Sequence, residues 1–489
     1  MALKICNSQT KKKEEFIPLQ AGKVGIYVCG ITAYDVCHVG HARSAVVFDV
    51  VTRYFRYRGF DVTYVKNFTD VDDKIIDNAL REKKGIAEIS ERYIREHDED
   101  MAALGVARPT VTPRATEHIP GMIRLVALLL DKGMAYVAGG DVYYAVETFP
   151  GYGKLSGRNL ADMLAGARID VNDQKRNPYD FALWKGSKEG EPGWESPWGR
   201  GRPGWHLECS VMSQQYLGDT FDIHGGGEDL IFPHHENEIA QSEGARDKPL
   251  ARYWIHNGFV RVNSEKMSKS LGNFFTIRDV LKQYHPEVLR LFMLQSHYRS
   301  PVDFSDAALS EARQGMNRLY ATLQTVRELL VAAEGKADAA RGAAAMDGEI
   351  LGQLQILRER FVEAMDDDFN TARALGCLFD TVRLLNAALT AKKAAVSFAA
   401  LRQTEQALRE IGAVLGLLGE EPDRYFSRDR DREAAKRGLA VAEIEALIAQ
   451  RRVAREAKEW QKADEIRRNL AERGVVLKDS PAGTTWTVG

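Results

Sequence analysis

The sequence has few cysteines, no long apolar run and almost no net charge. Its 489 residues include five cysteines, an odd number scattered along the chain, which excludes a disulfide framework. Unpaired thiols suit a reducing compartment, so we expect a cytoplasmic protein. The apolar run from Leu125 to Leu130 is far shorter than the ~20 residues that span a bilayer, and no apolar stretch follows the N-terminal lysines. We therefore expect neither a membrane segment nor a secretory signal.

The charge balance limits how the chain could bind nucleic acid. A net charge of -2 gives the chain no overall basic field, so a nucleic-acid partner would need a local basic patch. The content of hydrophobic residues, 44%, and of charged residues, 28%, is that of a soluble globular protein. The length corresponds to about three domains.

A strand, a helix and a second strand follow one another near the N-terminus. Val24 to Cys29 is a buried strand that stops at Gly30, Ala42 to Arg58 is a helical run, and Asp61 to Asn67 alternates like a strand. This order predicts a right-handed βαβ unit and a parallel sheet. Ligands bind at the carboxyl ends of the strands in such sheets.

The rest of the chain divides into an insertion and two helical regions. We expect a Rossmann-like α/β domain over residues 1–305, with a Gly-, Pro- and Trp-rich insertion at about 110–200. Leu and Ala at helical spacing predict a helical bundle over 306–419. A small, mainly α domain follows over 420–489, and its charged first part, Glu420 to Arg437, is interpreted as a linker.

Two short motifs predict a site for the phosphates of ATP. His38-Val39-Gly40-His41 places two imidazoles at a helix N-terminus, which favours anions, and Gly40 allows close approach to the backbone. Lys266-Met267-Ser268-Lys269-Ser270 places two ammonium groups on a loop that could close over a triphosphate. Each motif is weak alone, but together they predict catalytic roles for His38, His41, Lys266 and Lys269.

A glycine-rich strand end is a further candidate for nucleotide binding. His224, Gly225 and Gly226 follow a short apolar strand and suggest that the backbone approaches the ribose and adenine of ATP. Nearby, Asp229 could pair with an amino group and Trp205 could form the wall of a small pocket.

Four residues form a candidate metal site. His234 and Glu238 are four positions apart at a helix start, so both side chains lie on one face. Cys29, at the end of the first strand, and Cys209 could complete the set, while His235 is a rival ligand from the same helix. Spacing alone cannot show that the two cysteines converge.

Taken together, these segments resemble the cysteinyl-tRNA synthetases, a family of class I aminoacyl-tRNA synthetases. The resemblance extends over nearly the whole chain and is carried by Tyr27–Gly30, Tyr34–Arg43, Asn67–Lys74, Gly201–Ser210, His224–Asp229, His234–Glu238 and Glu265–Asn273. It implies a catalytic Rossmann-like domain that activates L-cysteine with ATP and Mg²⁺ and transfers the cysteine to tRNA(Cys). A monomer is expected.

The resemblance also implies roles for individual residues. It implies one Zn²⁺ held by Cys29, Cys209, His234 and Glu238, which binds the substrate thiol as a thiolate, and a cysteine pocket that includes Gly30, Thr69, Trp205 and Asp229. In the C-terminal region it favours tRNA anticodon contacts by a basic and aromatic group of residues: Arg451, Arg452, Arg455, Trp460 and Arg467. The alternative for that region is a solvated amphipathic helix, because acidic residues are interleaved.

Two other functions stay open at this point. A related ligase could make the same adenylate and transfer cysteine to a small amine such as an amino sugar, although such an acceptor needs no C-terminal module. A non-catalytic, zinc-containing RNA-binding protein is the more distant alternative, and the intact histidines and lysines of both ATP motifs argue against it.

Overall fold

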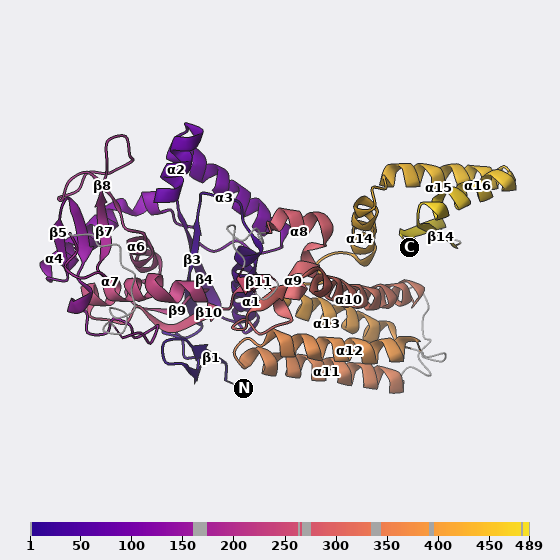
Figure 1. Ribbon diagram of the computed structural model, residues 1–489. Coiled ribbons are helices and arrows are strands. Elements are labelled where there is room, and N and C mark those ends of the chain that lie inside the picture. Colours follow the sequence, from indigo (N-terminus) through magenta and orange to yellow (C-terminus); the bar gives the residue numbers. More distant parts are fainter. Residues whose placement is uncertain are drawn as a thin grey trace.

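The structure is a computed structural model that describes residues 2–159, 174–262, 265–266, 275–333, 344–390, 396–480 and 483–488. The molecule is elongated, with a parallel sheet in its N-terminal half, a helical bundle beside it and a small C-terminal unit at the far end (Figure 1). Within the described ranges, no helix is both long and apolar enough to cross a membrane.

A four-stranded parallel sheet is the centre of the N-terminal half. Its strands, in spatial order, are β10 (Ala251–Asn257), β9 (Phe221–Gly227), β3 (Lys23–Thr32) and β4 (Asp61–Thr69). Helix α1 (Val39–Tyr57) connects β3 to β4, and all three contacts between strands are parallel. The predicted strand–helix–strand unit and the Rossmann-like α/β fold class are therefore confirmed.

Shorter elements surround this sheet. The hairpin of β1 (Lys4–Asn7) and β2 (Lys12–Glu15) lies beside β10, and two helices follow β4, namely α2 (Asp73–Glu82) and α3 (Ile86–Ala103). Beyond β10, a small sheet has the order β12 (Glu265–Lys266), β11 (Val260–Val262), β13 (Val302–Phe304), with α8 (Ile277–Gln283) and α9 (Pro286–Leu294) between β12 and β13.

The region between β4 and β9 contains a second sheet of a different kind. After α4 (Ile119–Asp131), strands β5 (Ala135–Ala138), β6 (Asp141–Tyr144), β7 (Phe181–Gly186) and β8 (Gly201–Pro203) pair in sequence order and are antiparallel. Helix α6 (Trp205–Leu217) then returns the chain to the parallel sheet. The sequence indicated the break in rhythm but not this antiparallel architecture.

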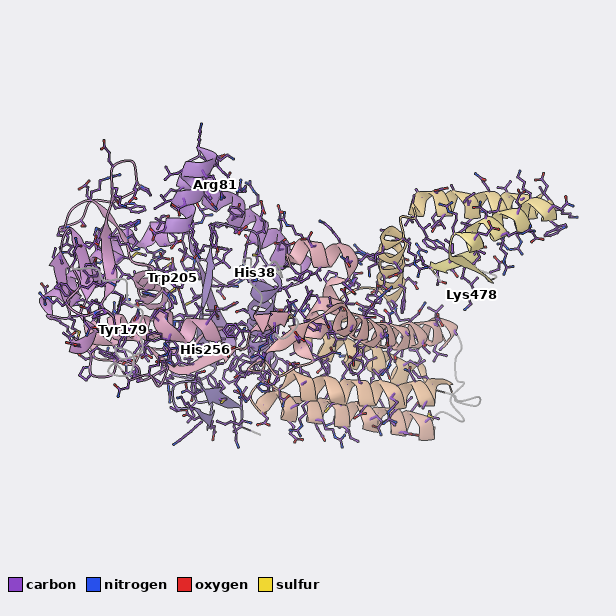
Figure 2. All side chains as sticks on the ribbon, in the orientation of Figure 1. His38, Arg81, Tyr179, Trp205, His256 and Lys478 are labelled. Atoms are coloured by element: carbon purple, nitrogen blue, oxygen red, sulfur yellow. The ribbon has the colours of Figure 1, made fainter. Side chains whose placement is uncertain are left out.

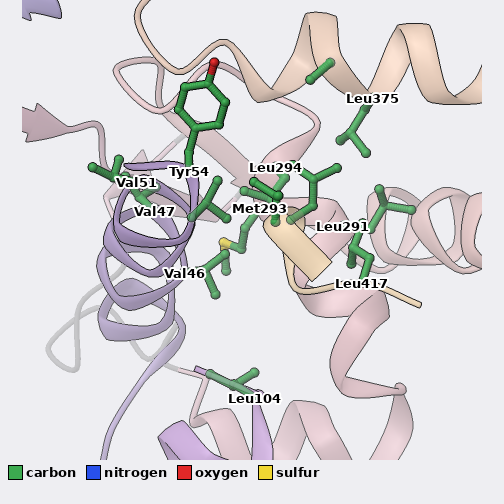
Figure 3. Close-up of a cluster of buried hydrophobic side chains, with 14 of the residues drawn as sticks. Val46, Val47, Val51, Tyr54, Leu104, Leu291, Met293, Leu294, Leu375 and Leu417 are labelled. Atoms are coloured by element: carbon green, nitrogen blue, oxygen red, sulfur yellow. The ribbon is translucent and has the colours of Figure 1, made fainter. Parts of the chain in front are cut away.

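Four long helices form the bundle: α10 (Asp306–Ala333), α11 (Ala344–Asp366), α12 (Thr371–Thr390) and α13 (Phe398–Leu415). The bundle is not a separate core, because α1 and α9 pack into the same continuous hydrophobic cluster. Figure 3 shows Val46, Val47 and Val51 of α1 beside side chains of α9 such as Met293 and Leu294. The site at the N-terminus of α1 is thus anchored to the bundle.

The expected linker over Glu420 to Arg437 is wrong, because Pro422–Lys436 forms helix α14. Tyr425 of α14 is fully buried and stacks on Tyr320 of α10, with 3.9 Å between ring centroids. Arg313 of α10 also binds Asp429 at 2.9 Å. The charges that suggested a linker therefore serve partly to attach this helix to the bundle.

The C-terminal unit follows α14. It contains α15 (Val441–Glu456), α16 (Trp460–Glu472), β14 (Val475–Ser480) and β15 (Gly483–Val488). The two strands form an antiparallel hairpin. Its hydrophobic cluster, which includes Ile444, Leu470 and Trp486, is separate from that of the bundle.

Candidate active site

A cleft lies at the carboxyl ends of the parallel strands. Its walls come from the end of β3, the start of α1, the end of β4 and the segments after β9 and β10. The lining residues are Cys29, Gly30, Ile31, His38, Gly40, His41, Ser44, Lys66, Gly227, Asp229, Leu230, Asn257, Gly258, Phe259 and Val260. Figure 2 shows His38, Trp205 and His256 around the sheet and Lys478 in the distant C-terminal unit.

The two histidines of the first motif form the N-terminal cap of α1. His38 is the N-cap residue, and its Nδ1 accepts a hydrogen bond from the Gly40 amide at 3.0 Å. His41 Nδ1 accepts reciprocally from the His38 amide at 3.3 Å, and the two rings stack with centroids 3.8 Å apart. This capping box fixes both rings at the edge of the cleft.

The cap also fixes where each ring carries its proton. Since both Nδ1 atoms accept hydrogen bonds from amides, the neutral rings carry the proton on Nε2. Burial lowers the pKa of His38 to about 4 and lowers the pKa of His41 well below its usual value. The pair is therefore neutral near pH 7 and can offer Nε2–H donors to phosphate oxygens.

A close backbone approach shapes the cleft between β3 and β4. The Gly30 amide donates to Asn67 Oδ1 at 2.8 Å, and a Cβ at Gly30 would lie 1.5 Å from the Asn67 carbonyl oxygen. Any side chain at this position would force the strands apart. Gly30, predicted to contact cysteine, thus lies in the cleft next to the candidate metal ligand Cys29.

The structure brings the four predicted metal ligands together. One donor atom from each of Cys29, Cys209, His234 and Glu238 lies within 4.8 Å of all the others. The two sulfur atoms are 3.6 Å apart, and His234 Nε2 is 3.0 Å from Glu238 Oε1. Cys29 also lines the cleft, so the cluster opens toward it.

The donor set and its spacing fit a tetrahedral metal ion. Two thiolates on one Zn²⁺, each at about 2.3 Å, would be about 3.8 Å apart, close to the observed separation of the two sulfur atoms. Burial raises the pKa of Glu238, but the neighbouring His224 and His234 outweigh this effect and hold the pKa well below its usual range. A buried carboxylate among thiols and imidazoles is a cation-binding environment.

The neighbouring charges also shift the pKa values of two other candidate ligands, Cys209 and His234. Burial raises the pKa of the Cys209 thiol, but the hydrogen bond with Cys29 and the charge of His234 outweigh it and lower the pKa to about 6. For His234 burial lowers the pKa, but Glu238 and Cys209 raise it to about 10.

A second group of donors overlaps the first. Cys29, His224, His235 and Glu238 also bring one donor atom each within 4.8 Å of one another. His235 Nε2 is 3.3 Å from Cys29 Sγ but 3.9 Å from Glu238 Oε1, and its Nδ1 is 2.8 Å from His256 Nε2. His235, the rival ligand named from the sequence, thus lies beside the same donors, and the geometry also fits His235 as a metal ligand.

The other predicted cysteine-pocket residues surround this cluster. Trp205, the first residue of α6, stacks on His234 with 4.1 Å between ring centroids and is 39% exposed. Thr69 is buried at the end of β4 and donates to Glu208 Oε2 at 2.5 Å. Asp229 lines the cleft and is exposed. The pocket roles of these residues stay predictions.

The predicted nucleotide-binding residues of β9 lie deeper. His224 is fully buried, its Nε2 is 2.8 Å from Glu238 Oε2, and its ring stacks on Trp254. Cβ atoms on Gly225 and Gly226 would meet Phe48 and His235, respectively. These three residues do not line the cleft; the neighbouring Gly227 does. Their predicted contact with ATP stays a prediction.

The second motif is only partly described. Lys266 lies in β12, where its backbone pairs with Arg261 of β11, and Lys269 lies outside the described residues. β11, with which β12 pairs, begins at the cleft residue Val260. The backbone of Lys266 is thus paired with a strand that starts at the cleft wall. The catalytic roles of both lysines stay predictions.

The basic residues of the C-terminal unit have different surroundings. Arg451 is buried and forms two hydrogen bonds of 2.8 Å to Asp479, which join α15 to β14. Arg455 approaches the same carboxylate at 3.3 Å. Arg452, Trp460 and Arg467 are exposed.

Sequence reasoning missed several residues at the site. Lys66 and Asn257 line the cleft, and His206 Nδ1 is 2.8 Å from His234 Nδ1. Lys66 directly precedes the segment Asn67–Lys74, so its position at the end of a strand was the available signal.

Comparisons with known proteins show which family the chain belongs to. Residues 15–314 match the family described as tRNA synthetases class I (C) catalytic domain, 360–419 match the DALR domain, and 437–486 match the cysteinyl-tRNA ligase anticodon binding domain. Among curated relatives, the cysteine–tRNA ligases of Geobacter metallireducens and Geobacter sulfurreducens are each 57% identical, and each match covers 100% of both chains.

Solved structures show the same fold at low identity. The methionyl-tRNA synthetase of Mycobacterium tuberculosis, in complex with methionyl-adenylate, aligns with a TM-score of 0.60 at 16% identity, over 86% of this chain and 94% of that chain. The Agrobacterium radiobacter LeuRS in a ternary complex with tRNA and LeuAMS aligns with a TM-score of 0.59 at 12% identity, over 85% and 86%. On the family matches and the full-length identities, the chain belongs to the cysteine–tRNA ligase family of class I aminoacyl-tRNA synthetases.

Proposed function

We propose that this protein joins L-cysteine to tRNA(Cys) at the expense of ATP. Cysteine would first react with ATP to give cysteinyl-adenylate and pyrophosphate, and the cysteinyl group would then move to the 3′-terminal adenosine of the tRNA. The main observation behind the proposal is that the donor atoms of Cys29, Cys209, His234 and Glu238 lie close together beside the cleft at the N-terminus of α1. Full-length relatives with this activity in their names support it.

The four clustered residues would select the substrate. Zn²⁺ held by Cys29, Cys209, His234 and Glu238 would bind the thiolate of cysteine and disfavour the hydroxyl of serine. A purely apolar pocket separates close analogues only about 10–200-fold, so a sulfur-selective site removes the need for editing. Gly30, Thr69, Trp205 and Asp229 would form the rest of the pocket, with Asp229 near the substrate ammonium.

The first and second motifs would act on ATP. His38 and His41 would donate their Nε2–H groups to phosphate oxygens as charge builds in the transition state, and Lys266 and Lys269 would add two positive charges. Gly40 would allow close approach to the backbone, and His224, Gly225 and Gly226 would contribute to nucleotide binding. Mg²⁺ would enter with ATP.

The C-terminal unit would hold the tRNA. Arg452, Arg455, Trp460 and Arg467 would contact its backbone and stack on its bases. Arg451, through its ion pair with Asp479, would support that surface from behind. We infer a cytoplasmic, monomeric enzyme, as the sequence suggests.

Charging of purified tRNA(Cys) with labelled cysteine, with serine as competitor, tests the proposal. We expect cysteine-specific charging, and Lys269→Ala should reduce ATP–pyrophosphate exchange by orders of magnitude while the zinc content stays unchanged. Cysteine-dependent exchange without charging of any tRNA would favour the ligase with a small acceptor. Absence of both from zinc-replete protein would overturn the enzyme assignment.

A further inference from the structure

Lys66 is a cation inside the candidate active site. It lies near the end of β4, on the strand next to Gly30 and Ile31 of β3, and its side chain is half-buried and lines the cleft together with His38 and His41. Its neighbours Val65 and Asn67 are buried on the other face of the strand, because successive side chains alternate. Lys66 therefore points to the side of the sheet where α1 begins.

The charges along the described walls of the cleft are very few. Among the described residues that line it, Lys66 is the one lysine or arginine and Asp229 is the one acid. His38 and His41 are neutral near pH 7 because burial lowers the pKa of both. In the described part of the cleft, Lys66 is therefore the one side chain that could offer a full positive charge to a bound phosphate.

Among the described residues, the ammonium of Lys66 forms no ion pair within 4.0 Å and no side-chain hydrogen bond, and its backbone amide donates to the Val111 carbonyl. The carboxylate of Asp98 acts on the ammonium from a longer distance. Burial lowers the pKa of this ammonium and outweighs Cys37 and Asp98, which raise it. A half-buried cation without a close ion pair costs stability, and such residues are typical of functional sites.

We propose that Lys66 is a further catalytic residue, which contacts the α-phosphate of ATP and stabilises the negative charge that develops there during activation of the amino acid. This inference rests on the proposed function. In the step concerned, a carboxylate oxygen of the amino acid forms a bond to the α-phosphorus. The bond from that phosphorus to the bridging oxygen breaks, and pyrophosphate leaves with its electron pair. Lys66 contributes charge and transfers no proton.

The test compares Lys66→Met, Lys66→Arg and wild type in ATP–pyrophosphate exchange and in tRNA charging. We expect the exchange rate of Lys66→Met to fall about 100-fold, with a smaller change in KM for ATP, as for loss of one transition-state contact. Lys66→Arg should retain more activity than Lys66→Met because the positive charge remains. The melting temperature of Lys66→Met should equal or exceed that of wild type, since an unpaired charge is removed.

Lys132→Met is the matched control, because Lys132 is also a lysine but lies at the C-terminal cap of α4, pairs with Asp247 at 2.7 Å and does not line the cleft. It should exchange at the wild-type rate. Unchanged exchange in Lys66→Met would overturn the inference, and so would a loss confined to tRNA charging. A lower melting temperature, or equal impairment of the Arg and Met variants, would also overturn it. Failure of wild type itself would instead overturn the proposed function.

Discussion

His38 uses its two ring nitrogens for different purposes. Its Nδ1 caps α1 through the Gly40 amide, and this contact leaves the ring proton on Nε2. The cap contact and the phosphate contact that we propose thus use different atoms of one side chain. A substitution that keeps the first and removes the second can lower activity without lowering stability.

We predict that His38→Asn keeps the fold but loses activation. Asn is a good N-cap residue, so its Oδ1 can replace Nδ1 as acceptor, whereas nothing replaces the Nε2–H donor. ATP–pyrophosphate exchange should fall by about 10²–10³-fold, and the melting temperature should stay near that of wild type. His38→Gln is the reciprocal control, because its amide can reach the Nε2 position but no longer caps the helix. If His38→Asn exchanges at the wild-type rate, Nε2 has no catalytic role.

The pKa of His38 gives a second prediction for the same variant. The free side chain has a pKa of 6.5 and the folded protein lowers it to about 4, so between these values the unfolded state binds a proton that the folded state does not. Stability from this site is therefore present above pH 6.5 and is lost as the pH falls toward 4. Urea unfolding at pH 7 and pH 5 should show a smaller loss for His38→Asn than for wild type. Equal losses would contradict the assigned pKa.

At the scale of elements, α1 connects the active site to the bundle. The first turn holds the two catalytic-site histidines, the middle packs against α9, and the second half contacts the bundle. Tyr54 donates to Asp366 of α11 at 2.6 Å, and Tyr57 donates to Glu410 of α13 at 3.0 Å. A movement of the bundle would therefore also move the N-terminal end of α1, where we propose that ATP binds.

A buried ion pair fixes α1 to α9, and we predict that Asp49→Asn breaks it at large cost. Arg290 Nη2 is 2.6 Å from Asp49 Oδ2, and both residues are 1% exposed. Asn preserves the volume but leaves the buried guanidinium without its anion, which costs about 3–5 kcal/mol. Urea unfolding measures this loss. Asp247→Asn removes one partner of a surface pair with Lys132 and should cost under about 1 kcal/mol. Similar losses in both variants would contradict the argument.

Local patterns predicted the elements that carry strong periodicity. β3 and β4 extend beyond the expected boundaries, and α1 runs from Val39 to Tyr57 rather than from Ala42 to Arg58, because caps and strand ends follow hydrogen bonds that hydrophobicity does not report. The linker prediction failed at α14 since its high charge concealed contacts such as that of Tyr425 with Tyr320, which depend on a partner helix. A high content of charged residues therefore does not by itself indicate a linker, because the same residues can form a helix.

The site was predictable only in part for a related reason. His38 and His41 are close in sequence, so their spacing indicated a shared helix start. Cys29 and Cys209 lie 180 positions apart, so they could be named as candidate ligands, but spacing could not show that they meet. Lys66 was missed because a single lysine in a strand forms no motif, and the role we propose for it depends on how few of the described lining residues of the cleft are charged.

At the scale of the whole molecule, the C-terminal unit is set apart from the catalytic sheet. It has its own hydrophobic cluster around Trp486 and is joined to the bundle through α14 (Figure 1). Arg430 of α14 lies over the Trp486 ring at 4.0 Å, which links the unit to its connecting helix. Because the unit lies far from the cleft, its surface can change tRNA binding without changing the chemistry of activation.

Arg452→Ala combined with Arg467→Ala should therefore separate the two half-reactions. Both residues are exposed on the C-terminal unit, and their removal should raise KM for tRNA about tenfold, weaken the salt dependence of charging and leave ATP–pyrophosphate exchange unchanged. The matched control is Arg383→Ala with Arg402→Ala, which removes the same charge from exposed positions on the bundle. Charging assays at two salt concentrations compare the pairs. An equal effect of both would mean that tRNA responds to overall charge rather than to this surface, whereas a loss of exchange would mean that the unit supports the fold of the active site.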